Sequence, residues 1–191
     1  WHRVFTSSGD YGLEFKSIYG YVGIYAEYEP FIIEGVNESG LSAGLFFYSL
    51  YEDLLCEEPE DSQHTLTDMQ FVSWVLARFS SIGQVKKGLK EVHLVSLDHR
   101  IGSVHWRIAE PSGRMVVVEV VDGVPVFYEN PIGVLTNSPD FPWHLKNLNN
   151  YINIAPGNAP DATLNNKLRL RSLGQGSGML GLPGDFTSPS R

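Results

Sequence analysis

Two polar side chains in the last third of the chain stand on stiffened loops, where they could take part in binding or catalysis. Asn137 follows an apolar stretch and precedes Pro139, so its carboxamide lies just past a predicted strand and before a turn. Arg191 ends a segment, residues 181–191, that is rich in glycine and proline. Because loops held by a rigid scaffold carry many functional groups, these two residues are the first candidates for chemistry, as a hydrogen-bond donor and a cation.

Each candidate also has an ordinary structural explanation. Asparagine is a favourable N-cap, so Asn137 could simply begin the helix predicted after it. Arg191 could simply lie on the protein surface, as most arginines do. No Ser/His/Asp or Cys/His set stands out from spacing alone, so residue types by themselves leave both interpretations open.

Composition and charge favour a globular protein and exclude some partners. The chain has 191 residues, of which 42% are hydrophobic and 19% are charged, and this predicts a single domain over residues 1–191. The net charge of -8 argues against a nucleic-acid partner, whose binding needs clustered Lys and Arg. No apolar run approaches the roughly 20 residues of a membrane span. We therefore expect neither nucleic acid nor membrane as a partner.

Cysteine and histidine usage predicts neither a metal site nor a cofactor. The single cysteine, Cys56, lies among acidic residues that disfavour its thiolate, so it is a poor nucleophile. His93, His99 and His105 recur in the sequence, but no HExxH motif and no cysteine or acid at ligand spacing accompanies them.

The chain starts at Trp1 and shows no signal peptide, so a cytoplasmic or periplasmic location stays open.

The first half of the chain predicts strands around one turn, followed by helices. Residues 19–26, 31–36 and 41–48 are rich in aromatic and β-branched residues, and the last two flank Asn37-Glu38-Ser39-Gly40, a turn signal. The same asparagine matches a glycosylation sequon, which the turn explains equally well. A loop is expected over the acidic segment 51–64.

Two helices are predicted after this loop. Phe71, Trp74, Val75 and Phe79 recur at the spacing of one apolar helical face, and Thr65 has the spacing of an N-cap to Asp68. A second, shorter helix is predicted over residues 82–91.

The second half of the chain predicts a β-meander and a short helix. Apolar residues alternate over 104–108, and the nearly continuous apolar run 115–121 predicts a strand buried on both faces. Asp122-Gly123 is a hairpin signal before the strand 124–128, and residues 133–136 predict another strand. A helix over 140–151 and mostly loop over 152–191 complete the prediction of an α+β fold with helices over a largely antiparallel sheet.

Several ordered segments together resemble a known family. They are Asn37-Glu38-x-Gly40-Leu41, His105-Trp106, Val116-Val117-Val118-Glu119, Leu135-Thr136-Asn137-x-Pro139-x-Phe141, Asn147-Leu148-x-Asn150-Tyr151, Gly181-Leu182-Pro183-Gly184-Asp185 and Ser188-Pro189-Ser190-Arg191. In this order they resemble the choloylglycine hydrolase family, which contains bile salt hydrolases and penicillin V acylases. The resemblance covers nearly the whole chain.

The resemblance implies an N-terminal-nucleophile hydrolase with an αββα sandwich, incomplete at both ends in this chain. Members of the family cleave a linear amide bond with a cysteine at the mature N-terminus, whose own α-amino group serves as the base. The family's cysteine precedes Trp1, and Cys56 stands in the wrong place to replace it. The resemblance therefore assigns the amidase activity to a longer parent protein.

The resemblance also assigns roles to residues of this sequence. Asn137 matches the family's asparagine whose carboxamide belongs to the oxyanion hole, and Arg191 matches its active-site arginine. Preorganised donors stabilise the oxyanion of the tetrahedral intermediate, and a fixed cation favours thiolate over thiol. The second oxyanion donor is expected to be the backbone N–H of Phe47, with Phe46 as the alternative.

The resemblance implies a small amphipathic amide substrate and leaves its identity open. Conjugated bile salts, penicillin V and long-chain acyl homoserine lactones all join an apolar acyl group to an amide. Bile salt hydrolases tend to carry asparagine where this chain has Phe47, and penicillin V acylases tend to carry tyrosine, so an aromatic residue leans toward the acylases. The neighbouring aromatic residues fit either an apolar substrate wall or the core: Phe46, Phe47, Tyr48 and Trp143.

Two further implications rest on the family alone. A homo-oligomer, a tetramer by family analogy, is expected. The alternative to an enzyme is a non-catalytic relative that kept the scaffold as a binding or structural domain and lost the cysteine. The residue at the N-terminus of the mature parent protein distinguishes the two, because only cysteine there supports catalysis.

We predict that the 191 residues alone show no amidase activity, because the family's nucleophile is missing from them. A turnover assay on the isolated 191-residue chain checks this, with conjugated bile salts and penicillin V as substrates. Hydrolysis that disappears when Cys56 is replaced by serine would contradict the prediction.

Overall fold

The structure is a computed structural model that describes residues 2–5, 11–26, 31–48, 62–97, 103–151 and 161–170. The chain divides into two compact units, Trp1–Asp140 and Phe141–Arg191, and each is described by itself. The single domain over residues 1–191 therefore stays a prediction. Three of the residues weighed in the sequence lie outside the described ranges: Cys56, His99 and Arg191.

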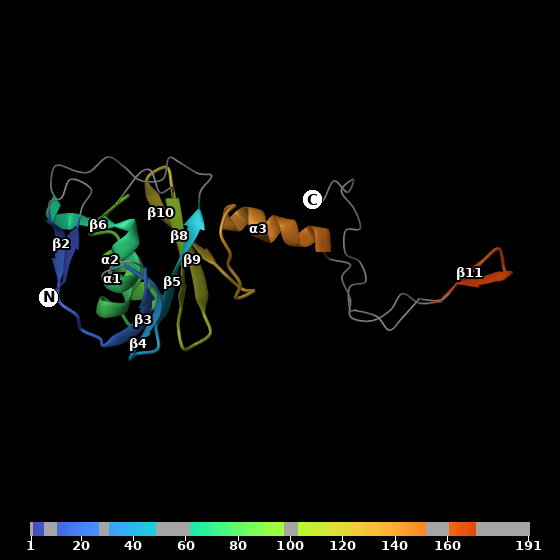
Figure 1. Cartoon of the computed structure of the whole chain (residues 1–191), viewed down its shortest axis with the longest axis horizontal. Coiled ribbons are helices and arrows are strands. Elements are labelled where there is room, and N and C mark those ends of the chain that lie inside the picture. The colour runs from blue at the N-terminus through green and yellow to red at the C-terminus, as the bar shows by residue number, and fades with distance from the viewer. Residues whose placement is uncertain are drawn as a thin grey trace. The chain divides into compact units, whose positions relative to one another are not determined.

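The first unit is built around an antiparallel sheet of six strands in the order β10-β9-β8-β5-β4-β3 (Figure 1). Both predicted groups of strands are confirmed except for the strand expected over residues 133–136, and the pairing of β5 with β8 joins them. The bounds are β3 Tyr21–Tyr25, β4 Ile32–Asn37, β5 Ser42–Tyr48, β8 Ser103–Ala109, β9 Met115–Val121 and β10 Val124–Glu129.

Helix α1 Phe71–Arg78 lies against β4 and β5 of this sheet, and α2 Ile82–Gly88 follows it (Figure 1). Gly35 on β4 permits the close approach of α1, because a Cβ there would lie 2.7 Å from Leu76 Cδ1. The α+β class is therefore confirmed by a helical layer on a largely antiparallel sheet.

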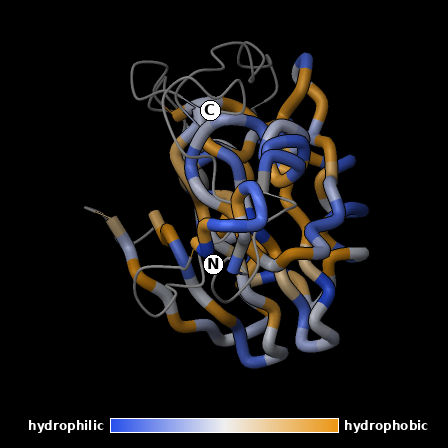
Figure 2. Tube along the Cα trace, turned by 90° about the vertical axis from the view of Figure 1, so that its right-hand side faces the viewer, coloured by the Kyte–Doolittle hydropathy of each residue, from blue (hydrophilic) through white to orange (hydrophobic). Residues whose placement is uncertain are grey.

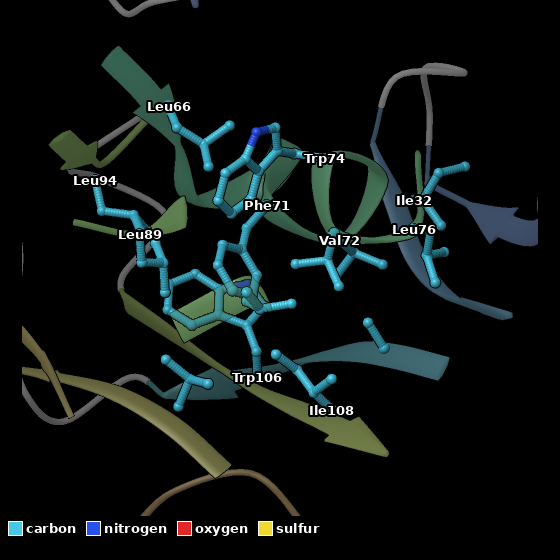
Figure 3. Packing of buried hydrophobic residues seen from close by; sticks show 14 of the residues in the cluster. Ile32, Leu66, Phe71, Val72, Trp74, Leu76, Leu89, Leu94, Trp106 and Ile108 are labelled. Carbon is cyan, nitrogen blue, oxygen red and sulfur yellow. The ribbon is translucent and has the colours of Figure 1, made fainter. Parts of the chain in front are cut away.

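Helix α1 differs from its prediction in being buried on nearly every side, since all residues from Phe71 to Ala77 are buried. Toward the sheet, the Phe71 ring lies 4.5 Å from the Trp106 ring (Figure 3). On other sides, the same core includes Phe15, Leu66 and Leu94. They come from short strands outside the main sheet: β2 Tyr11–Phe15, paired with β1 His2–Phe5, and β6 Thr65–Thr67, paired in parallel with β7 His93–Val95.

The start of α1 also differs from the prediction. Thr65 is not an N-cap, because its backbone pairs with His93 in the parallel β6–β7 ladder. A 3-10 turn, Asp68–Gln70, separates this strand from the helix. The second helix begins as its sequence indicates, with Ser81 Oγ accepting a hydrogen bond from Gln84 N at 3.3 Å.

The turn between β4 and β5 ties α1 to the sheet. Asn37 is only 4% exposed, and its Nδ2 donates to the carbonyl oxygens of Leu76 at 2.9 Å and Phe79 at 2.7 Å. Its Oδ1 accepts from Ser39 N, Ser39 Oγ and Leu41 N. The predicted turn is confirmed. The carboxamide nitrogen that a glycosylation sequon would offer is used inside the protein.

The β-meander follows the predicted pattern closely. Residues 116–120 of β9 are all buried, as expected for a strand covered on both faces. Asp122 and Gly123 have φ values of 50° and 74°, which are the left-handed values that a tight β9–β10 hairpin requires. Hydrophobic and hydrophilic segments alternate along the chain in Figure 2.

One prediction for the last third of the chain is wrong. Residues 133–136 form no strand, because side chains bind the carbonyls of Val134 and Thr136 in place of a neighbouring strand. Within the segment predicted as mostly loop, residues 161–170 form a hairpin, β11 Ala162–Leu164 and β12 Leu168–Leu170, whose turn uses positive φ at Asn165 and Asn166. The predicted short helix is confirmed as α3 Phe141–Asn147, followed by a 3-10 turn, Leu148–Tyr151.

The helices of the described residues are short. None of them has the length and the apolar composition that a membrane-spanning helix needs.

Replacing Asn37 with alanine should lower the free energy of unfolding by about 2–4 kcal/mol, because buried donors and acceptors lose their partner. Unfolding in urea, followed by tryptophan fluorescence, measures this change. The matched control, Ser39→Ala, removes a single hydroxyl bond to the same carboxamide and should cost about 1 kcal/mol or less. Equal losses in the two variants would contradict the role given to Asn37.

Candidate active site

The end of β5 and the loop after β10 meet at two of the predicted site residues. Phe47 N donates to Asn137 Oδ1 at 3.1 Å, although the two residues are 90 positions apart. The next residue of the loop returns the contact, because Ser138 N donates to the Phe47 carbonyl oxygen at 3.1 Å. The fold thus brings together the carboxamide and the backbone N–H that the sequence predicted as a pair of donors.

This contact sets the orientation of the Asn137 carboxamide. An N–H group needs an acceptor, so the Oδ1 atom faces Phe47 and the Nδ2 donor is turned away from it. Asn137 is not the N-cap of the next helix, because α3 begins at Phe141 and Asp140 directly precedes it. Both Asn137 and Phe47 are exposed, so a ligand can reach the pair.

The aromatic residues on β5 divide between the surface and the core. Phe47 is 44% exposed beside the candidate site, Phe46 is half-buried, and Tyr48 is buried. In the first unit, Phe47 is therefore the residue that fits an apolar substrate wall, and Tyr48 belongs to the core. Trp143 is exposed and belongs to the second unit.

Three anchors hold the loop that carries Asn137. Near its start, Asn130 accepts from Gly133 N at 3.0 Å and donates to the Val134 carbonyl oxygen at 2.9 Å. At the second anchor, the Thr136 carbonyl oxygen accepts a hydrogen bond from His105 Nε2 at 2.9 Å. The contacts of Asn137 and Ser138 with Phe47 complete the set. Because these bonds replace a β-ladder, the segment is fixed in place without being a strand.

The sequence pattern alone does not indicate His105 as a site residue. It is fully buried on β8, and its Nδ1 lies 3.0 Å from Oε1 of Glu119 on β9, which is 1% exposed. The ring stacks on Tyr48 with centroids 4.7 Å apart. The predicted hairpin could have indicated this pair, because Trp106 lies opposite Val118 and the next residues along the two antiparallel strands are His105 and Glu119.

The proton positions in this cluster follow from the acceptors around it. A carbonyl oxygen can only accept, so His105 Nε2 carries the hydrogen that reaches Thr136. The other ring nitrogen, Nδ1, lies 3.0 Å from the Glu119 carboxyl. The imidazole therefore joins β9 to the loop.

Two other features of the first unit lie apart from this site. A shallow hollow of about 670 Å³ is lined by residues around β3, at the far edge of the sheet from β10, and includes neither Phe47 nor Asn137. Within the described residues, no group of three or more His, Cys, Asp or Glu side chains could hold a metal ion.

A family model of linear amide C–N hydrolases, the choloylglycine hydrolase family, matches residues 3–191. The chain belongs to the choloylglycine hydrolase family. The predicted resemblance is thereby confirmed over almost the whole sequence.

Several curated relatives of the chain are bacterial bile salt hydrolases. The chain is 36% identical over 179 residues to the bile salt hydrolase/transferase of Clostridium perfringens, covering 92% of this chain and 54% of the relative. It is 34% identical to the enzyme of the same name from Lactiplantibacillus plantarum, covering 91% of this chain and 54% of the relative. A penicillin V acylase of Pectobacterium atrosepticum is 27% identical, covering 79% of this chain and 43% of the relative. The chain thus spans about half the length of these bile salt hydrolases.

Solved structures of related proteins share the fold of this chain. A cysteine-to-alanine variant of the conjugated bile acid hydrolase of Clostridium perfringens matches with a TM-score of 0.78 and 34% identity, covering 98% of this chain and 57% of that chain. The penicillin V acylase of Agrobacterium tumefaciens, with a TM-score of 0.61 and 23% identity, supports the fold alone. The predicted N-terminal-nucleophile hydrolase fold is therefore confirmed.

Membership of the choloylglycine hydrolase family does not by itself assign roles to the residues of this chain. The structure brings Asn137 and Phe47 together, whereas Arg191 lies outside the described residues. The roles of all three residues therefore stay predictions.

Tyr128 reports on the electrostatics beside this cluster. Burial raises the pKa of Tyr128 above its ordinary value of 10, and the negative charges of Glu119 and Asp140 raise it further. Because the folded-state pKa is raised, this tyrosine contributes stability below pH 10 that is lost as the pH rises through the folded-state value.

Glu119→Gln should lower the pKa of Tyr128 and leave it above 10, because one negative charge is removed and burial remains. Titration of carbon-13-labelled tyrosine by NMR measures the change, and Tyr128→Phe identifies the resonance. Identical titration curves for Tyr128 in Glu119→Gln and in the unmodified protein would show that Glu119 does not act on the phenol.

Proposed function

We propose that the whole protein is a cysteine N-terminal-nucleophile hydrolase that cleaves the amide bond of conjugated bile salts. The observation that supports it best is the meeting of Asn137 with the Phe47 N–H on an exposed edge of the sheet. The family match adds the reaction class, because its description names linear amide C–N hydrolases.

The proposed chemistry is an acyl transfer through the N-terminal cysteine of the whole protein. The thiolate sulfur attacks the amide carbonyl carbon, and the α-amino group accepts the thiol proton. Collapse of the tetrahedral intermediate breaks the C–N bond, and the amine leaves with that proton. Water then hydrolyses the thioester, which releases the acid and restores the cysteine.

Asn137 would stabilise the oxyanion that forms in each attack. Its Nδ2 donates a hydrogen bond without a proton to lose, which suits a group that must stay neutral through the cycle. Removing one such donor typically costs about 2.7–4 kcal/mol of transition-state stabilisation. Arg191 would act as the fixed cation that favours the thiolate.

The Phe47 N–H has two possible contributions in this proposal. It donates to Asn137 Oδ1 in the structure and thereby holds the carboxamide at a fixed angle. To donate to an oxyanion as well, it would have to exchange that acceptor, which requires the carboxamide of Asn137 to rotate. We propose the orienting contribution as its main one, because it needs no rearrangement during the reaction.

The substrate is proposed from the relatives and qualified by one residue. Bile salt hydrolases are more similar to this chain than the penicillin V acylase of Pectobacterium atrosepticum is, at 36% against 27% identity. The exposed aromatic ring of Phe47 favours instead the phenoxyacetyl group of penicillin V, because it offers an apolar surface at the candidate site. Penicillin V acylase activity is therefore the second candidate, and acyl homoserine lactones are the third substrate to test.

A non-catalytic member of the family remains the alternative to an enzyme. It would keep the sheet and the loop of Asn137 as a binding or structural domain. Sequencing the N-terminus of the mature whole protein separates the two, because any residue other than cysteine there contradicts the proposed chemistry.

Replacing Asn137 with alanine in the whole protein should lower kcat/KM by about 100-fold or more, because one oxyanion donor is lost. Release of glycine or taurine from conjugated bile salts measures the rate, and penicillin V and acyl homoserine lactones are assayed beside it. The matched control is Asn149→Ala, an exposed asparagine in the second unit, which should keep full activity.

The relative turnover of these substrates distinguishes the candidate functions. Turnover of bile salts above that of the other substrates supports the first proposal, and preference for penicillin V supports the second. Turnover of none of them would contradict the proposed substrate class. Full activity in the Asn137→Ala variant would exclude this residue from the oxyanion site.

A further inference from the structure

We propose that His105 and Glu119 are positioning residues that set the backbone of the Asn137 loop and thereby aim its carboxamide. The inference rests on the proposed function for its kinetic consequences, while its structural part can be measured without any substrate. The observation behind it is a chain of contacts from the buried carboxyl of Glu119, through His105, to the peptide beside Asn137.

The bond from His105 reaches the backbone at the position where it has most effect. The Thr136 carbonyl belongs to the planar peptide unit whose nitrogen is that of Asn137. The hydrogen bond of 2.9 Å from His105 Nε2 to this oxygen therefore fixes the orientation of the peptide plane between Thr136 and Asn137. The Phe47 contacts hold the side-chain oxygen of Asn137 and the N–H of Ser138 on the other side.

The imidazole is itself held rigidly. Its ring stacks on Tyr48 at 4.7 Å and meets the edge of Phe46 at 6.1 Å, and both aromatic residues stand on β5 beside Phe47. Glu119 binds the Nδ1 atom, which fixes the ring orientation and leaves the hydrogen on Nε2 for Thr136. Phe47 and Asn137 are thus positioned from the same cluster.

Burying a pair such as His105 and Glu119 costs desolvation free energy, and apolar residues of similar volume often give a fold of equal stability. A purely structural role therefore explains the burial of His105 and Glu119 less well than a positioning role. The energetic consequence is also large enough to measure, because a misplacement of about 1 Å in a catalytic group can cost about 100-fold in rate.

Two substitutions at position 105 separate the two ring nitrogens. Gln places its amide nitrogen near the position of Nε2, so His105→Gln can still donate to Thr136. Asn is one methylene shorter and places its amide near Nδ1, so His105→Asn keeps a partner for Glu119 and loses the bond to Thr136. The pair therefore tests the bond to the loop apart from the bond to β9.

In the whole protein, His105→Asn should lower kcat about 10- to 100-fold with KM changed less than about threefold, and His105→Gln should recover most of the loss. If His105 acts through Asn137, then His105→Asn should cost less than about threefold in the Asn137→Ala background. A purely structural role would instead make the two losses multiply, or would affect both variants at position 105 equally.

Hydrogen exchange of the Phe47 and Ser138 amides gives a readout that needs no activity. Exchange should accelerate at least tenfold in His105→Asn and stay near the unmodified rate in His105→Gln. Faster exchange in His105→Asn, in a protein that turns over no substrate, supports the positioning role while contradicting the proposed function. Unchanged exchange in a folded His105→Asn variant overturns the proposal, whatever the activity.

Glu119→Gln keeps the proposal testable where His105→Asn does not fold. Its amide can donate to Nδ1, so the bond between His105 and Thr136 should survive and amide exchange at Ser138 should change less than about threefold. A folded Glu119→Ala variant, which removes the partner of Nδ1, should instead accelerate exchange at Ser138 at least tenfold, and exchange as slow as in Glu119→Gln would overturn the positioning role of Glu119.

Discussion

The antiparallel pairing of β5 with β8 is the contact on which the described fold depends most. Its register runs from Ser42–Ala109 to Tyr48–Ser103 and joins two local groups of strands into one sheet of six. Because side chains alternate along a strand, a slip of one residue would exchange the faces of β8. His105 would then face α1, and Trp106 would leave the core where it packs on Phe71.

That pairing also explains how one sheet serves both stability and a site. On the helix side it buries Trp106, Ile108 and Ala43 with α1 in a continuous apolar core (Figure 3). On the other face it stacks His105 on Tyr48, next to the end of β5 that meets the Asn137 loop. The rigidity that the core gives to the strands is therefore passed to the loop through a few polar bonds, which is how a loop can hold a group in a fixed orientation.

Much of the local structure could be predicted from sequence because its signals are local. Asp122-Gly123 is a strong hairpin signal between two strands, and the apolar spacing of Phe71, Trp74 and Val75 is that of one helical face. The errors came where tertiary partners decide. Thr65 entered a parallel pair with His93 rather than capping a helix, and residues 133–136 found side-chain partners rather than a strand.

The sequence alone determined the family, the α+β class, and Asn137 and Phe47 as candidate donors, because ordered motifs and residue types carry that information without coordinates. Only the tertiary structure decided that these two residues touch, that the Asn137 oxygen faces Phe47, and that His105 and Glu119 lie beneath the loop. The reason is physical: hydrogen bonds between residues far apart in the chain depend on strand register and packing, which no local pattern specifies.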